Sequence, residues 1–328
     1  MRALAIALSL FATSLAACAD TQGAPPASIA SGESTTSARL ETFTSDAAGF
    51  DTHSFWLDTG REVVAFDAQF TPAAAQLLIA DITTKTRSPI RYVIVTHPNP
   101  DKFNGAPAFQ AVGAKVVASE HTARAIPGVH AYKKGYFVNV AKSFTEATYP
   151  AQATVDLTFS GDLDLPLEGG AKVQLHELAH PGVSSTQTVA YIPQANALVV
   201  GDLVHVKAHA WLEGGIVNGK PAPDLDAWKL ALGELRAYRG ATVYGGRGGT
   251  APVEEAVSGE QAYLDRMRAL VRGYVKQLGP KKSELSGPNA AAHYAAIAKL
   301  AAKELPDHAF PYLVEYGAYG LINQVAAE

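Results

Sequence analysis

The stretch that decides the fold is THPNPDKFNG, residues 96–105. It follows Arg91–Val95, a continuous apolar run typical of a strand that is buried on both faces. The stretch itself mixes prolines, asparagines and charges, so we expect a loop at the carboxyl edge of that strand. Open α/β sheets usually place their sites at this edge. The first candidates for functional side chains are therefore His97, Asn99, Asp101 and Lys102.

Short β-rich runs alternate with helical patterns from Phe43 onward, which is typical of layered α/β folds. Val63–Phe66 predicts a strand that ends at Asp67. Pro72–Lys85 predicts a helix, because a proline fits the first turn and the preceding Thr71 can cap it. Further strands are predicted at residues 114–118, 172–176, 188–192, 197–200 and 241–244.

The sequence becomes helical after Pro252. Apolar residues recur at helical spacing from Leu264 to Leu278, and Gly279 with the proline after it ends this helix. A second helix is predicted at about residues 289–305. One side of these helices is apolar, so we expect them to pack on the main domain or to form a homodimer contact. The aromatic tail at residues 310–321 fits plain packing or the cover of a cleft.

Residues 1–18 have the pattern of an export signal. Arg2 precedes the apolar run Ala3–Ala17, which is too short to span a bilayer as a mature helix. The run ends in Leu15–Cys18, which resembles the lipobox of bacterial lipoproteins and implies acylation of Cys18; an ordinary signal with a chance cysteine is the alternative. Residues 19–40 predict a flexible tether. We therefore expect lipid anchoring in the inner or outer membrane, on the periplasmic side of the cell envelope.

The composition excludes some classes of protein. The formal net charge is −4, which gives no polycationic surface for nucleic acid. The one cysteine rules out a disulfide within the chain. Apolar residues make up 48% of the sequence, enough for a large core.

Residues 41–252 resemble the metallo-β-lactamase superfamily. Active members carry T-H-x-H-x-D-H where this chain has residues 96–102, so His97 and Asp101 are kept, while Asn99 and Lys102 occupy two ligand positions. The strand that ends at Asp67 is similar to the superfamily's first motif. The resemblance implies an α/β fold, the four-layer αββα sandwich, here followed by a helical extension at residues 253–328. It also implies kinship with metal-dependent hydrolases.

The remaining ligand motifs of the superfamily are altered in the same way. Val183 stands where P-G-H-T has its histidine, and Arg247 replaces the last histidine, whereas Asp202 matches the bridging aspartate. Competent residues therefore remain at three of the seven ligand positions: His97, Asp101 and Asp202. A zinc site normally needs at least three protein ligands, and neither metal position reaches that number.

The replacements exchange metal cations for side-chain cations. We expect Asp101 and Asp202 to form a salt-bridged pseudo-site with Lys102 and Arg247, because a buried carboxylate without a partner is costly. Such a network would only hold loops, or it would form a pocket for an anion or a polar small molecule. The predicted substrate contacts are His205, His209 and Trp211. Lys133 and the lysine after it are predicted to be a solvated surface pair.

Two enzymatic alternatives remain open. One is a hydrolase of an ester, lactone, thioester or lactam with a single zinc or other divalent metal, held by the three retained residues and by His180 after a loop shift. The other is a metal-free enzyme with Ser184 or Ser185 as nucleophile, although no G-x-S-x-G elbow is present. The sequence specifies neither a substrate nor an oligomeric state.

Overall fold

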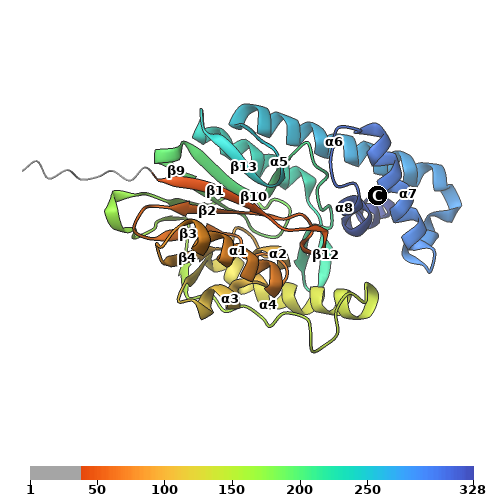
Figure 1. The fold of residues 1–328 in the computed structure, drawn as a ribbon. Helices are drawn as coiled ribbons and strands as arrows, with labels where there is room; N and C mark the ends of the chain where they lie inside the picture. The colour runs from red at the N-terminus through yellow and green to blue at the C-terminus, as the bar shows by residue number, and fades with distance from the viewer. Residues whose placement is uncertain (1–37) are drawn as a thin grey trace, which may run out of the picture. The chain divides into compact units, whose positions relative to one another are not determined.

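The computed structural model describes residues 38–328, which belong to one compact unit with two six-stranded sheets (Figure 1). The predicted signal with Cys18, and most of the predicted tether, lie outside these residues. Among the described residues, no helix combines the length and the apolar character that crossing a membrane requires.

The first sheet has the strand order β1-β2-β3-β4-β5-β6. Its first three strands pair antiparallel and the last four pair parallel. The strands are β1 (Arg39–Thr44), β2 (His53–Asp58), β3 (Val63–Phe66), β4 (Ile90–Ile94), β5 (Lys115–Ser119) and β6 (Leu157–Phe159). The helices that follow its parallel strands are α1 (Pro72–Lys85), α2 (Pro100–Phe103), α3 (Ala106–Ala111) and α4 (Glu120–Gly135).

The second sheet has the order β14-β13-β10-β9-β8-β7, and only β10 and β13 pair parallel. Its strands are β7 (Asp162–Asp164), β8 (Gln174–Glu177), β9 (Thr188–Ile192), β10 (Ala197–Val206), β13 (Thr242–Gly248) and β14 (Thr250–Pro252). A hairpin of β11 (Gly215–Val217) and β12 (Lys220–Ala222) precedes α5 (Leu225–Glu234). The C-terminal helices are α6 (Val253–Leu278), α7 (Ala290–Glu304), α8 (Tyr312–Gly317) and α9 (Tyr319–Ala327).

Three apolar cores separate these layers. Phe66 and Ile94 of the first sheet meet Leu175 and Val199 of the second in the core between the sheets. Alternate residues on the same strands, such as Ala65, pack against the helices outside the first sheet. A third core joins the second sheet to α5 and the C-terminal helices. The predicted αββα sandwich with a helical C-terminal extension is therefore confirmed.

Local sequence signals predicted several elements well. β3 and α1 have the predicted bounds, and the Thr71 hydroxyl accepts a hydrogen bond from the Ala74 amide at the start of α1. α6 ends at Gly279, whose φ of +54° suits glycine. The prediction of a loop throughout residues 96–103 was wrong at its end, where Pro100 begins α2. We did not predict α4 or α5.

Two backbone hydrogen bonds fasten α2 to the segment after β3. The Ala68 amide donates to the Lys102 carbonyl at 2.9 Å, and the Gly105 amide donates to the Gln69 carbonyl at 3.0 Å. A Cβ on Gly105 would lie 1.9 Å from the Ala68 carbonyl oxygen. Only glycine allows the two backbones to approach this closely, and this approach sets the position of α2.

We predict that Gly105→Ala lowers the free energy of unfolding by about 1–3 kcal/mol, because the added methyl group meets backbone that must move. Urea denaturation of both chains measures the change. Gly128→Ala is the control. Gly128 is an exposed residue of α4, and no atom outside its own helix turn lies within 4 Å of its Cβ position. Equal loss of stability in the two variants would contradict the role assigned to Gly105.

Candidate functional site

Four charged side chains meet where the two sheets face each other: Asp101 and Lys102 from α2, Asp202 from β10 and Arg247 from β13. We call them the ion-pair cluster. Lys102 Nζ lies 2.8 Å from Asp202 Oδ1 and 3.0 Å from Asp101 Oδ2. Arg247 Nη1 donates to Asp202 Oδ2 at 2.9 Å, and its Nη2 donates to Asp101 Oδ2 at 3.0 Å. Each cation therefore contacts both carboxylates.

Arg247 has two further partners. Its Nε donates to the Phe50 carbonyl at 2.7 Å, and its Nη2 also donates to the Thr52 hydroxyl at 2.8 Å. Arg247 is 3% exposed and Lys102 is fully buried. The guanidinium group is thus held by the segment between β1 and β2 as well as by the two carboxylates.

Two glycines allow the strands to come close to the cluster. A Cβ on Gly201, whose φ is +52°, would lie 2.3 Å from the Thr96 hydroxyl oxygen. A Cβ on Gly246 would lie 1.8 Å from Asp202 Oδ1. The register of β10 against β13 shifts beside Gly201. Side chains at these two positions would displace Asp202 from the cluster.

Asp67 lies behind Lys102, at the end of β3. Its Oδ1 accepts hydrogen bonds from the Thr96 amide at 3.0 Å and the Thr96 hydroxyl at 2.9 Å, and its Oδ2 lies 3.8 Å from Lys102 Nζ. Burial raises the pKa of Asp67 to about 7, although Lys102 and Thr96 oppose the rise. This carboxyl group therefore takes up a proton near neutral pH.

His97 is fully buried beside Asp202. Its Nδ1 lies 3.0 Å from the Thr96 hydroxyl oxygen and its Nε2 lies 3.8 Å from Asp202 Oδ2. Burial lowers the pKa of His97 to about 4. The imidazole is therefore neutral at pH 7 and adds no charge to the cluster.

Burial and ion pairing act in opposite directions on the cluster. Burial alone would raise the pKa of Asp202, but Arg247 and Lys102 hold that pKa well below its usual range. The same two cations lower the pKa of Asp101 against its burial. Burial opposes the charge of Lys102, but Asp101 and Asp202 raise its pKa. All four groups are charged at neutral pH.

The other predicted ligand positions lie apart from the cluster. His180 is partly exposed, and its Nδ1 lies 2.8 Å from Glu234 Oε1 of α5. Val183 is fully buried in the core outside the second sheet. The structure thus brings His97, Asp101 and Asp202 together but pairs His180 elsewhere. In residues 38–328, no group of three or more His, Cys, Asp or Glu side chains is placed to hold a metal ion.

The serine alternative has no support in the geometry. Ser184 and Ser185 both have buried hydroxyl oxygens that lack a hydrogen-bond partner within the part of the chain that the structure describes. No histidine is therefore placed as a base beside either hydroxyl, which nucleophilic catalysis would require.

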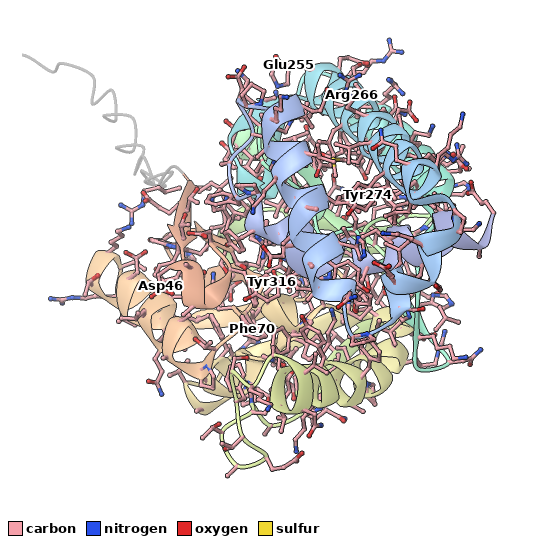
Figure 2. The ribbon with its side chains drawn as sticks, turned by 90° about the vertical axis from the view of Figure 1, so that its right-hand side faces the viewer. Asp46, Phe70, Glu255, Arg266, Tyr274 and Tyr316 are labelled. Atoms are coloured by element: carbon pink, nitrogen blue, oxygen red, sulfur yellow. The ribbon has the colours of Figure 1, made fainter. Side chains whose placement is uncertain are left out.

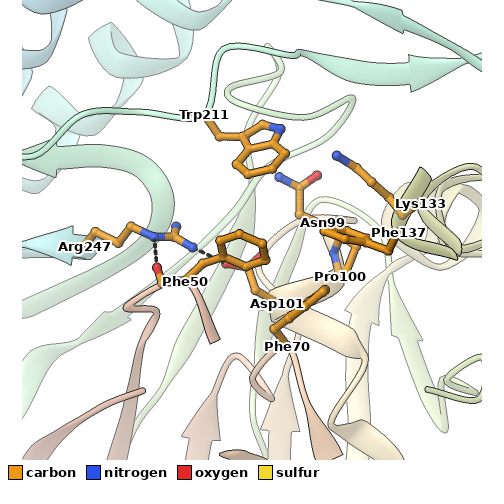
Figure 3. Close-up of a pocket in the computed structure, with 9 residues that line it drawn as sticks. All are labelled: Phe50, Phe70, Asn99, Pro100, Asp101, Lys133, Phe137, Trp211 and Arg247. Carbon is orange, nitrogen blue, oxygen red and sulfur yellow. Dashed lines mark hydrogen bonds and ion pairs between the residues drawn. The ribbon is translucent and has the colours of Figure 1, made fainter. Parts of the chain in front are cut away.

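A small cavity adjoins the cluster, and we call it the aromatic cavity (Figure 3). Its volume is about 30 Å³, close to the space that one water molecule takes in the liquid. Four of the nine lining residues are aromatic, and Asp101 and Arg247 of the cluster also line it. The lining residues are Phe50, Phe70, Asn99, Pro100, Asp101, Lys133, Phe137, Trp211 and Arg247.

One of the three predicted substrate contacts lines this cavity. Trp211 does so, whereas His205 and His209 do not. His205 is buried between Asp202 and Glu260, with its Nδ1 3.6 Å from Glu260 Oε1. His209 is fully buried, and its Nδ1 lies 3.3 Å from the Tyr263 hydroxyl oxygen. Both histidines therefore pack against residues of α6.

The prediction that Lys133 is solvated was wrong. Lys133 is 3% exposed, pairs with Glu213, and places its ammonium group 4.7 Å from the centre of the Trp211 ring. Ile126 and Val129 lie seven and four residues before it, so the spacing of α4 puts Lys133 on the buried face. Recognising that helix in the sequence would have indicated the burial.

The aromatic wall was not predicted. Phe50 lies 5.0 Å from Phe70 and 5.9 Å from Phe137, measured between ring centres. Phe137 lies in a π-helical turn, Tyr136–Val140, that continues α4. These three phenylalanines come from distant segments, so no local pattern indicates their meeting.

Comparisons with known proteins agree with this architecture. The metallo-β-lactamase superfamily model matches residues 47–247. A metallo-β-lactamase from Pontibacter korlensis is 23% identical with a TM-score of 0.52, and the match covers 70% of this chain and 95% of that one. FIM-1 from Pseudomonas aeruginosa, in its mono-zinc form, is 17% identical with a TM-score of 0.50, covering 69% and 89%.

A metallo-β-lactamase from Erythrobacter litoralis is 13% identical with a TM-score of 0.51, covering 70% of this chain and 93% of that one. A search of the curated proteins gives no match. These identities show a shared fold and say nothing of a shared substrate. The superfamily model spans more than half of the chain, and so this protein belongs to the metallo-β-lactamase superfamily.

Proposed function

We propose that this protein is a non-hydrolytic member of the superfamily, in which Lys102 and Arg247 replace the two metal ions and the adjoining cavity binds a small molecule. The observation that carries the proposal is that both cations contact both Asp101 and Asp202. The two side-chain cations thus neutralise the carboxylates that the superfamily resemblance assigns to the metal ions.

The residues present do not fit a metal pair. Both oxygens of Asp202 and one oxygen of Asp101 already accept hydrogen bonds or ion pairs from Lys102 and Arg247. A metal ion would have to displace a buried ammonium or guanidinium group, and the displaced charge would lose its partners. His97 then remains as the one nitrogen ligand retained from the superfamily pattern, and zinc sites favour nitrogen and sulfur donors.

The charges of the cluster balance without a metal. Asp101 and Asp202 are negative, Lys102 and Arg247 are positive, and Asp67 is about half protonated near pH 7. A network of equal opposite charges with satisfied hydrogen bonds is the arrangement in which buried ions are tolerated.

The geometry favours a small molecule over an anion. Arg247 was the expected anion anchor, but its Nε, Nη1 and Nη2 all donate to protein oxygens. No nitrogen of that guanidinium group is left without a partner. The nearby cavity has aromatic walls instead, which suit an uncharged organic group.

We also propose export and lipid anchoring at Cys18. The basic Arg2, the apolar run after it and the small residues before the single cysteine support this location. The cluster would then work at the periplasmic side of the cell envelope, where its ligand would have to be found.

The first prediction concerns metal content. Full-length protein purified in detergent after metal-supplemented growth should contain zinc, iron and manganese well below one per chain, measured by elemental analysis. The positive control introduces the superfamily's histidines at the cluster with Asn99→His, Lys102→His and Arg247→His, and should gain metal because the glycines beside the cluster are kept. About one metal per wild-type chain that is lost in Asp202→Ala would overturn the proposal.

The second prediction uses the raised pKa of Asp67. In the unfolded chain its pKa is about 3.8, and in the folded protein about 7, so the folded state holds the proton between these values. The contribution of Asp67 to the free energy of unfolding is fully present below about pH 4. This contribution is lost as the pH rises through 7. We expect the wild-type free energy of unfolding to fall relative to Asp67→Asn by up to about 1.4 kcal/mol per pH unit.

Urea denaturation of both chains at several pH values between 4 and 8 measures this difference. The comparison cancels the titration of the other carboxylates, because both chains contain them. A difference that stays constant over this range would show that Asp67 is ionised in the folded protein.

The third prediction concerns the anchor. Cells grown with radiolabelled palmitate should incorporate label into the wild-type protein and not into Cys18→Ser, because the acyl group needs that thiol. Membrane fractionation should place only the wild type in the envelope pellet. Equal labelling of the two chains would rule out acylation at Cys18.

A further inference from the structure

The aromatic cavity has unused hydrogen-bonding groups on its wall. Asp101 Oδ2 forms an ion pair with Lys102 and accepts hydrogen bonds from Arg247 and Thr52. Within residues 38–328, Asp101 Oδ1 accepts no hydrogen bond. The Asn99 side chain, at the start of α2, makes no capping hydrogen bond. Asp101 and Asn99 are both among the residues that line the cavity. The cavity therefore offers a free acceptor beside aromatic faces.

A ring from the C-terminal extension lies against the aromatic wall. Tyr316 of α8 stacks on Trp211, with ring centres 6.3 Å apart and planes at 7°, and it meets Phe50 edge to face at 6.0 Å. Tyr316 is 39% exposed, and Figure 2 shows it on the same side of the molecule as Phe70. Part of this side chain is therefore in contact with solvent.

Close contacts hold the backbone around Tyr316 against the segment that carries Trp211. A Cβ on Gly317 would lie 2.9 Å from the Leu212 amide nitrogen, and one on Gly320 would lie 2.2 Å from the Glu213 carbonyl oxygen. The Tyr312 hydroxyl donates to Asp51 Oδ2 at 2.6 Å. A ligand that takes the place of the Tyr316 ring would therefore have to move that ring while α8 keeps these contacts.

We propose that the aromatic cavity binds a neutral, planar aromatic molecule with an O–H or N–H group, which stacks on Trp211 in place of Tyr316 and donates a hydrogen bond to Asp101 Oδ1. This inference rests on the proposed function, because a metal ion at Asp101 would compete for the same oxygen. The stacked Tyr316 is itself a phenol, so the chain already carries a group of the ligand's chemistry at this site.

The charges around the cavity favour a neutral ligand. Lys133 is paired with Glu213, and Arg247 is paired with Asp101 and Asp202. A charged ligand would enter a partly buried site without a free counter-ion, which is costly. The volume of about 30 Å³ in this structure is far below the roughly 300 Å³ at which small-molecule sites begin, so the ligand needs the space that Tyr316 takes.

The experiment uses full-length protein and two probes, phenol and toluene, with titration calorimetry as readout. Tyr316→Ala should bind phenol about three- to tenfold more tightly than wild type does, because the competing stacked ring is gone. Toluene has the same ring without the donor and should bind more weakly than phenol. Tyr274→Ala, which removes a tyrosine on α6, is the matched control and should bind phenol as wild type does.

Two outcomes would overturn the inference. One is phenol affinity in Tyr316→Ala equal to that of the wild type, with thermal unfolding showing that the variant is folded. The other is unchanged phenol affinity when Trp211→Leu is added to Tyr316→Ala. Metal analysis of the same samples separates the two proposals: absent metal with no phenol binding contradicts this inference alone, whereas stoichiometric metal contradicts the proposed function.

Discussion

The contacts of Lys102 and Arg247 with the same two carboxylates join the first sheet's side of the protein to the second sheet. Asp101 and Lys102 lie in α2, which follows a strand of the first sheet. Asp202 and Arg247 lie in β10 and β13 of the second sheet. Each of these groups would be costly to bury alone. Removing one partner from such a network typically costs about 3–5 kcal/mol, so the four groups must be kept or lost together.

This constraint also shapes what the site can do. The glycines that let β10 and β13 approach the cluster are suited to a compact centre, and here that centre is made of side chains. Every nitrogen of the Arg247 guanidinium group donates a hydrogen bond to an oxygen of the protein. The cluster therefore has few free hydrogen-bonding groups for a ligand. Asp101 Oδ1, which accepts no hydrogen bond within residues 38–328, is the exception, and Asp101 lines the aromatic cavity. Binding is therefore expected beside the cluster.

The C-terminal extension takes part in the same region. The superfamily match ends at residue 247, yet α6 places Glu260 beside His205, and α8 places Tyr316 on Trp211. Segments after the superfamily match thus contact β10 through Glu260 and the cavity residue Trp211 through Tyr316. The C-terminal extension contacts both β10 and Trp211 of the aromatic cavity. A change in this extension can therefore alter how a ligand reaches the cavity without altering the ion-pair cluster.

Local chemistry was enough to predict β3, α1 and the end of α6, because caps, proline positions and apolar periodicity act over a few residues. Motif positions and charge also predicted that Lys102 and Arg247 pair with Asp101 and Asp202. Only the tertiary structure decided that Lys133 is buried, that His180 pairs with Glu234, and that Phe50, Phe70 and Phe137 meet. These outcomes depend on packing between segments far apart in the chain, where the partner of a side chain is set by the fold as a whole.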